Sequence, residues 1–220
     1  MKKIFLDSAD STNDIARKLG EVNTVVVAER QSRGRGRNGR QWISGTGGLY
    51  ASFVLEKRRL LPIVAAISAA EAIDSFVNAD GRCQHSVEVK WPNDILVDGK
   101  KTSGILCEGC RDFDIVGVGI NVNNDPCLND ATCVRDLIGH DVSVTEMLDS
   151  LMSAMEKNFL RPDTDIIAEY RERCGMLGKR VWVKLRDRTV EGIAEIDDDG
   201  YLLVGDMRIG VADTIKVEND

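Results

Sequence analysis

The segment Ser32–Trp42 reads SRGRGRNGRQW, and it places four arginines and three glycines within eleven residues. The whole chain has 220 residues and a formal net charge of −7, so this positive charge is a local feature. Glycines let backbone N–H groups approach an anion closely, and arginines supply forked donors that match carboxylate and phosphate groups. The segment therefore suits an anion-binding loop, with Trp42 at its end offering a flat face for stacking or packing, and a solvated basic loop is the alternative interpretation.

The sequence on both sides of this loop predicts strands. Thr24–Glu29 (TVVVAE) is rich in β-branched residues, and Leu49–Leu55 (LYASFVL) is apolar with two aromatic residues, which is typical of buried strands. A basic loop could also bind RNA, but RNA-binding segments rich in arginine and glycine are usually long and disordered. A short loop between two apolar strands favours a structured binding site instead.

Hydrophobic periodicity predicts four helices and five further strands. Ser11 or Thr12 is expected to cap a helix that runs to Leu19 and ends at Gly20. The other three helices are expected to begin near Pro62 and to span Val144–Phe159 and Asp163–Arg173. The further strands are Lys3–Leu6, Val87–Trp91, Asp94–Val97, Lys101–Glu108 and Asp114–Val122, with a hairpin turn at Asp98–Gly99.

The pattern changes after Gly175, where short alternating stretches replace the helices. VWVKLR (181–186), TVEGIAEI (189–196), YLLVGD (201–206) and VADTIKV (211–217) predict a small all-β module. We expect one domain over residues 1–175 and a second over 176–220. Because the second lies near the lower size limit for independent folding, we expect it to lean on the first.

Composition excludes several classes of protein. No apolar run reaches the roughly 18 residues that span a bilayer, and the N-terminus turns acidic before a signal-peptide core can form. The acidic balance disfavours a general nucleic-acid binder. Without a secretory signal, a cytoplasmic location with reduced thiols is expected for the six cysteines, Cys83, Cys107, Cys110, Cys127, Cys133 and Cys174. The spacing of Cys107 and Cys110 suits half a zinc site, but that of Cys127 and Cys133 does not suit the other half.

The motif KWPND at Lys90–Asp94 carries polar side chains next to a proline. Pro92 cannot donate to a sheet, so a kink is expected there, and the kink would turn Asn93 and Asp94 toward a ligand. The Asn93 amide offers both a donor and an acceptor to a base edge. Asp94 could hold Mg²⁺ or orient an amine, and a plain turn is the alternative interpretation.

Two further motifs follow. Lys100 and Lys101 must point to opposite faces of their strand, so only one of them can face a pocket. Gly104 lies three residues beyond Lys101, where a ligand could approach the backbone closely. The stretch GVGIN places Asn121 at the end of an apolar strand, where it either faces a ligand or simply ends the strand.

Together these motifs resemble the biotin protein ligase (biotin–[acetyl-CoA-carboxylase] ligase) family. The matching stretches, which come in the family's order, are STN at 11–13, AERQSRGRGRNGRQW at 28–42, KWPND at 90–94, KTSGIL at 101–106 and GVGINVN at 117–123. The chain departs from the common pattern at Arg33, where a small residue is frequent. Many members carry an N-terminal DNA-binding domain, whereas this chain starts almost at the catalytic core, so we expect a ligase without repressor function or specific DNA binding.

The resemblance implies an α+β fold. It implies a catalytic domain with a mixed sheet and flanking helices, similar to class II aminoacyl-tRNA synthetase cores, followed by a small C-terminal SH3-like β-barrel. It also implies two reactions. Biotin and ATP give biotinyl-5′-adenylate and pyrophosphate, with Mg²⁺ as the expected metal, and a lysine of a biotin carboxyl carrier domain then attacks the adenylate.

The resemblance further assigns roles to residues. Catalytic roles fall to Arg37, Lys101 and Asp94, with Asp94 also the candidate Mg²⁺ ligand. The residues implied for biotin are Ser11, Thr12, Asn13, Gln31, Gly34, Arg35, Arg37, Lys101 and Gly104. At Gly34–Arg35 it is the backbone that is expected to contribute. The residues implied for ATP and the adenylate are Arg37, Arg40, Trp42, Asn93, Lys101 and Asn121.

Two other functions stay open at this point. The first is a lipoate or octanoate ligase of the same superfamily. The Gly/Arg loop at Ser32–Trp42 and the motif KWPND argue against it. The second is a biotin or nucleotide sensor without turnover, against which Lys101 and Arg37 argue. The sequence leaves the acceptor protein and the oligomeric state open, a homodimer included.

Overall fold

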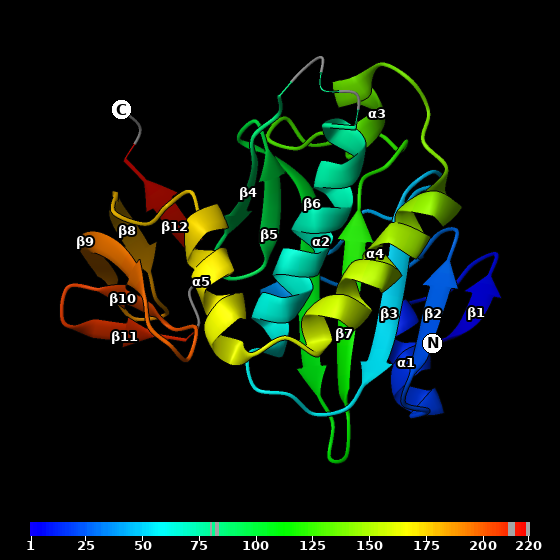
Figure 1. Cartoon of the computed structure of the whole chain (residues 1–220), viewed down its shortest axis with the longest axis horizontal. Helices are drawn as coiled ribbons and strands as arrows, with labels where there is room; N and C mark the ends of the chain where they lie inside the picture. Colours follow the sequence, from blue (N-terminus) through cyan, green and yellow to red (C-terminus); the bar gives the residue numbers. More distant parts are fainter. Residues whose placement is uncertain (80, 82–83, 211–213, 219–220) are drawn as a thin grey trace.

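The computed structural model describes residues 1–79, 81, 84–210 and 214–218, so Cys83 lies outside the described residues. The chain forms two sheets (Figure 1), a larger one of seven strands and a smaller one of five strands at its side. The order in the larger sheet is β1-β2-β3-β7-β6-β5-β4. Its strands are β1 (Lys2–Leu6), β2 (Thr24–Ala28), β3 (Leu49–Leu55), β4 (Val87–Lys90), β5 (Asp94–Val97), β6 (Lys100–Gly109) and β7 (Asp114–Ile120).

The larger sheet is mixed, as predicted. β1 and β2 are parallel, because helix α1 (Thr12–Leu19) returns the chain between them, and the other neighbouring pairs are antiparallel. The predicted bounds of β3 coincide with the observed ones. Asp98 and Gly99 both have positive φ in the β5–β6 turn, which confirms the predicted hairpin.

Helices cover the two faces of this sheet unequally. α2 (Leu61–Val77) and α4 (Val144–Phe159) pack together on one face, with α5 (Asp163–Arg173) beside α2, while α1 lies on the other face (Figure 1). Pro62 lies in the first turn of α2, and Gly20 ends α1 in the left-handed conformation, both as predicted. The sequence did not predict the short helix α3 (Val134–Ile138) or the 3₁₀ turn η1 (Arg37–Gly39).

Alternation along β7 separates these two faces. Val116, Val118 and Ile120 enter the large apolar core beneath α2 and α4, so Ile115, Gly117 and Gly119 face the opposite way. Ile115 joins Ala16 of α1 in a second, small core together with Val26 and Val54. Because α1 has only eight residues, it covers this face near Ile115, reaches Gly117 through the Asn13 side chain and leaves Gly119 uncovered by a helix.

The smaller sheet is the predicted SH3-like module and is antiparallel throughout, in the order β11-β10-β9-β8-β12. Its strands are β8 (Arg180–Lys184), β9 (Thr189–Ile196), β10 (Leu202–Val204), β11 (Met207–Ile209) and β12 (Thr214–Val217). The sequence reading missed β11, which has three residues.

The smaller sheet is docked on the larger domain. The Trp91 indole donates to the Gly200 carbonyl across 3.0 Å. The Arg171 side chain of α5 donates to the Ile196 carbonyl and pairs with Asp198 at 2.9 Å. A Cβ on Gly200 would lie 2.5 Å from Ile63 Cδ1, so the turn before β10 approaches α2 as closely as a glycine permits.

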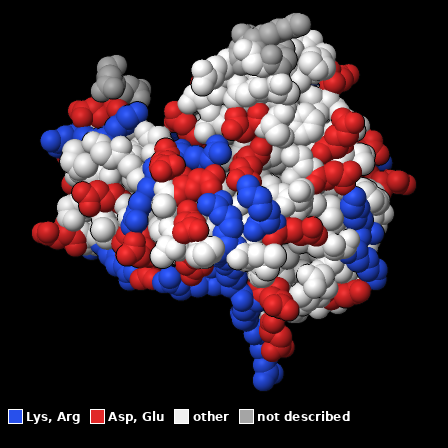
Figure 2. Space-filling model, in the orientation of Figure 1, with Lys and Arg blue, Asp and Glu red and all other residues white. Residues whose placement is uncertain are grey.

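The face formed by α2, α4 and α5 carries lysine and arginine side chains interspersed with aspartate and glutamate (Figure 2). This face therefore offers no broad area of one charge. None of the described helices combines the length and the apolar character needed to cross a membrane.

Candidate active site

A cavity of about 570 Å³ opens on the sheet face that α1 leaves uncovered. Its walls come from the start of α1, the loop after β2, the turn between β4 and β5, and strands β6 and β7. All of the predicted site residues line it except Gly34. Gly34 lies within the loop instead, where an added Cβ would meet Ser44 Oγ and the Trp42 carbonyl oxygen at 2.5 Å.

Three glycines form the floor of the cavity. Gly104 of β6 pairs with Gly119 of β7, and Gly117 lies two residues earlier on the same face. A Cβ on Gly119 would lie 2.4 Å from Trp42 Nε1, and one on Gly117 would lie 2.3 Å from Asn13 Oδ1. The glycines thus let flat groups lie directly on the sheet. Sequence reasoning missed Gly117 and Gly119 as floor residues, although their spacing in GVGIN already put them on one face.

One end of the cavity is built on the N-terminus of α1. Ser11 is the N-cap residue, but within the described part of the chain its hydroxyl makes no capping hydrogen bond. The Gln31 Oε1 atom takes that role, since it accepts from the Thr12 amide at 2.8 Å and from the Thr12 hydroxyl at 3.1 Å. Gln31 Nε2 donates to Ser44 at 2.9 Å. The loop and the helix start are therefore one hydrogen-bonded unit, which places the Ser11 hydroxyl at the cavity wall.

A buried polar chain continues from this unit into the sheet. The Ser52 hydroxyl lies 2.7 Å from Thr12 Oγ1 and 2.6 Å from Asn13 Oδ1. Asn13 Nδ2 donates to Glu108 Oε2 at 2.7 Å. Neither Ser52 nor Glu108 was predicted from the sequence. A polar residue inside the apolar strand LYASFVL was the available signal for Ser52.

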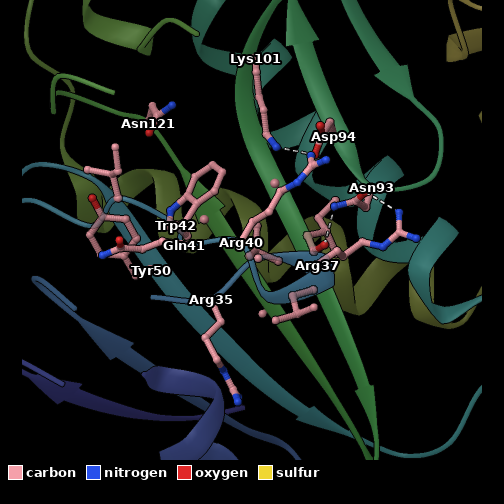
Figure 3. Close-up of a pocket in the computed structure, with 18 of the residues that line it drawn as sticks. Arg35, Arg37, Arg40, Gln41, Trp42, Tyr50, Asn93, Asp94, Lys101 and Asn121 are labelled. Carbon is pink, nitrogen blue, oxygen red and sulfur yellow. Dashed lines mark hydrogen bonds and ion pairs between the residues drawn. The ribbon is translucent and has the colours of Figure 1, made fainter. Parts of the chain in front are cut away.

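The Gly/Arg loop sends its arginines in different directions (Figure 3). Arg35 extends away from the centre of the cavity and pairs with Asp14 at 2.7 Å and Glu108 at 3.2 Å. Arg37 crosses to the β4–β5 turn and donates to Asn93 Oδ1 at 3.0 Å. Burial lowers the pKa of Arg37, an effect that Asp94 opposes and the nearby Arg40 reinforces.

Asn93 is fixed at both ends of its amide. Its Nδ2 donates to the Ile105 carbonyl at 2.9 Å while its Oδ1 accepts from Arg37. The turn that holds it contains the cis peptide bond between Trp91 and Pro92. Asn93 thus links the loop, through Arg37, to strand β6.

Lys101 faces the cavity and Lys100 is exposed, as the alternation predicted. The Lys101 ammonium lies 2.7 Å from Asp94 Oδ1 and 5.4 Å from the centre of the Trp42 ring. Its backbone is held on both sides, since its N–H donates to the Asp130 carbonyl and its own carbonyl accepts from Thr132. The cation therefore has a defined position between a carboxylate and an aromatic face.

Trp42 and Asn121 lie toward the other end of the cavity from α1. The Trp42 ring rests on Gly104 and Gly119, and its Nε1 is buried without a hydrogen-bond partner among the described residues. Asn121 is buried and accepts from Asn124 Nδ2 at 3.1 Å. Ile215 of the smaller sheet also lines the cavity.

None of the five described cysteines lines the cavity. Burial raises the pKa of the Cys174 thiol to about 11 and that of the Cys107 thiol to about 12. Both thiols are therefore protonated near neutral pH and are poor nucleophiles. In residues 1–79, 81, 84–210 and 214–218, no group of three or more His, Cys, Asp or Glu side chains is placed to hold a metal ion.

A polar cavity with a glycine floor and several converging cations defines a site for an anionic small molecule. Residues 5–125 match the biotin/lipoate A/B protein ligase family, and residues 176–207 match the biotin protein ligase C-terminal domain. The chain belongs to the biotin/lipoate A/B protein ligase family.

The chain is similar to named ligases. It is 31% identical over 226 residues to the biotin–[acetyl-CoA-carboxylase] ligase of Paracoccus denitrificans, covering 91% of this chain and 92% of that protein. It is 30% identical over 230 residues to the bifunctional ligase/repressor BirA of Bacillus subtilis, covering 91% of this chain and 68% of that protein. The structure of the biotin protein ligase from Aquifex aeolicus in complex with biotin and ATP matches with a TM-score of 0.83 and 27% identity, over 99% of each chain.

Proposed function

We propose that this chain joins biotin to ATP, forming biotinyl-5′-adenylate, and transfers the biotinyl group to a lysine of a carrier protein. The observation that carries the proposal is the convergence of Arg37, Arg40 and Lys101 on one glycine-floored cavity. The similarity to a ligase structure that holds biotin and ATP supports it.

Biotin would bind with its ring system at the α1 end of the cavity. Ser11, Thr12 and Gln31 offer hydroxyl and amide groups there for the ureido ring, and Gly117 lets the Asn13 amide lie close against the sheet beside them. Biotin's chain would then run toward Lys101 and Arg37, which bring its carboxylate next to the nucleotide. The backbone of Gly34 and Arg35 would close the loop side.

ATP would occupy the other end. Arg37, Arg40 and Lys101 are the cations for the phosphates, and Trp42 is the flat surface for adenine, with Asn121 beside it. Asn93 would act here mainly through Arg37, because both ends of its amide already have protein partners. An aromatic ring suits any base because stacking does not depend on base edges.

The chemistry requires no protein nucleophile. In the first step a biotin carboxylate oxygen attacks the α-phosphorus and pyrophosphate leaves. In the second step the carrier lysine attacks the acyl carbon, AMP leaves, and the amine loses a proton. The chain's residues hold the reactants in line and neutralise charge on the phosphates, which are the two largest sources of rate in such reactions. Asp94 lies where it can orient the incoming amine.

Mg²⁺ fits this site as a companion of the nucleotide. The ion usually binds through one or two carboxylates together with substrate phosphates and water, so it needs no preformed protein cage. Asp94 and Asp130 are the carboxylates among the described lining residues, and Asp94 is the candidate ligand because it lies beside Lys101. The ion would supply further charge neutralisation.

Three finer assignments accompany this proposal. We place the domain boundary between Gly175 and Met176, just before β8, and the site of action in the cytoplasm. We assign the biotin carboxyl carrier domain as the acceptor, because the chain is similar to biotin–[acetyl-CoA-carboxylase] ligases. A ligase acting on lipoate or octanoate is the competing function, and the match to a biotin-specific C-terminal domain speaks against it.

Biotin-dependent exchange of labelled pyrophosphate into ATP tests the proposal. Exchange should appear with biotin and should not appear with lipoic or octanoic acid. Exchange with lipoic acid alone would show that the competing function is right. Tight binding of biotin and ATP without any exchange would show that the chain is a sensor.

A further inference from the structure

We propose that Glu108 is a positioning residue that ties the Gly/Arg loop to the wall of the biotin end of the cavity. The inference rests on the proposed function, because it concerns the biotin end of that same site. Glu108 lies near the end of β6 and does not itself line the cavity. It acts through the two residues that it holds, Asn13 and Arg35.

The Glu108 carboxylate contacts three donor residues, two from α1 and one from the Gly/Arg loop. Asn13 Nδ2 donates to it at 2.7 Å from the first turn of α1. Arg17, one turn further along α1, pairs with it at 2.9 Å, and Arg35 of the loop pairs with it at 3.2 Å. The Glu108 side chain is 22% exposed, against 42% for each arginine, so its carboxylate is more enclosed than either cation.

The contact with Asn13 fixes the orientation of an amide at the cavity wall. A carboxylate only accepts hydrogen bonds, so the NH₂ group of Asn13 must face Glu108 and its oxygen must face Ser52. In this orientation Asn13 Oδ1 lies over Gly117, where an added Cβ would be 2.3 Å away. Removing the carboxylate leaves Asn13 Nδ2 with the longer contact to the Leu106 carbonyl, at 3.5 Å, so the amide is held less firmly over the floor.

The contact with Arg35 fixes the start of the loop. Arg35 and Gln41 form an isolated antiparallel bridge, and the Gly36 amide donates to the Arg40 carbonyl at 2.7 Å. The loop is therefore a small closed hairpin that carries Arg37, Arg40 and Trp42 at its tip and its second arm. Because Arg35 is turned away from the centre of the cavity (Figure 3), its ion pairs anchor this hairpin to β6 and α1.

Substitutions at two carboxylates, Asp14 and Glu108, distinguish the effect of anchoring the loop from the effect of holding Asn13 at the cavity wall. Asp14 pairs with Arg35 at 2.7 Å, so Asp14→Asn weakens the anchor and leaves the contact between Glu108 and Asn13 in place. Glu108→Gln removes the charge that Arg35 and Arg17 need, yet its amide oxygen can still accept from Asn13. Asp114→Asn is the matched control, because Asp114 follows Glu108 in the same hairpin and, among the described residues, its ion pair is with Lys57, at 3.3 Å.

The test is calorimetric titration of the full chain with biotin, without ATP, at low and at high salt. We expect Glu108→Gln to raise the Kd roughly threefold to tenfold at low salt, and less at high salt, as for partly exposed ion pairs. Glu108→Ala should raise it further, because the charge-assisted hydrogen bond to Asn13 is lost too. Asp14→Asn should have a smaller effect, and Asp114→Asn should bind as the unaltered chain does.

A double-mutant cycle separates positioning from a general structural effect. Arg35→Gln alone should weaken biotin binding by a factor similar to that of Glu108→Gln, and combining the two should add little. Full additivity, or unaltered biotin affinity in Arg35→Gln, would overturn the proposal even if Glu108→Gln folded poorly. Failure of the unaltered chain to bind biotin would instead overturn the proposed function.

Discussion

The two faces of the seven-stranded sheet are made by the same strands and serve different ends. Beneath α2 and α4, β7 contributes Val116, Val118 and Ile120 to one large apolar core. On the opposite face the alternating positions are Ile115, Gly117 and Gly119; α1 covers Ile115 and reaches Gly117 through Asn13, and Trp42 lies on Gly119. The filled face carries the side chains of β7 itself, whereas on the emptied face two glycines leave space in which Asn13 and Trp42 lie.

Successive residues of β7 therefore have different roles: one faces the apolar core and contributes to stability, and the next faces the cavity and contributes to the site. A change on the filled face should appear in the free energy of unfolding. A change on the emptied face should appear in substrate binding or turnover and leave stability nearly unaltered.

The largest effect is expected at Lys101. Lys101→Ala should lower adenylation by at least ~10²-fold, the scale for losing one preorganised donor at a charged transition state. Lys100 is exposed on the other side of β6, so Lys100→Ala should leave the rate near that of the unaltered chain. Single-turnover formation of biotinyl-adenylate measures both. Equal losses would show that the two faces of β6 are not separated as described.

Trp42 tests the same division, because it lies on the emptied face over glycines and is part of neither apolar core. Trp42→Ala should weaken ATP binding by about 1–3 kcal/mol, by analogy with the stacking of bases on aromatic side chains. The melting temperature without ligand should change little, because Trp42 lies over glycines rather than in either apolar core. Titration with ATP and a thermal scan give the two readouts. A large fall in melting temperature would assign Trp42 to the core.

Neighbouring positions of β7 compare the faces directly. Val118→Ala should lower the free energy of unfolding by about 1–2 kcal/mol, the usual cost of removing buried methyl groups. Gly119→Ala should weaken ATP binding instead, because the added methyl group would displace Trp42. Urea denaturation and ATP titration of both variants check this. Reversed outcomes would mean that the faces of β7 are assigned wrongly.

The smallest effect is expected at Arg37, which joins the loop to the β4–β5 turn. Arg37→Gly should still form biotinyl-adenylate but release it roughly threefold to tenfold faster, because one charge-assisted hydrogen bond to Asn93 is lost. Labelling of an unrelated lysine-rich protein should rise accordingly. Arg33→Gly in the same loop is the control, since Arg33 is exposed and does not line the cavity. Unaltered retention in Arg37→Gly would contradict a closing role for this loop.

The sequence predicted the elements and most of the cavity lining because both depend on local pattern. The helix over Asp163–Arg173 and the strand over Leu49–Leu55 have the predicted bounds, and Lys101 faces the cavity. Ser52 and Glu108 were missed because each contacts a partner far along the chain. Glu108 meets Asn13 across 95 positions, which only the pairing of strands in the sheet brings together.

The docking of Trp91 on Gly200 has a consequence for how the protein unfolds. The two sheets share one continuous apolar core, which includes Ile63 of α2 and Val181 of β8. Melting the smaller sheet alone would expose apolar surface on both sides and leave the Trp91 N–H without its acceptor. The two sheets should therefore unfold in a single cooperative transition. The smaller sheet is thus part of the same cooperative folding unit, and removing it should destabilise the larger domain.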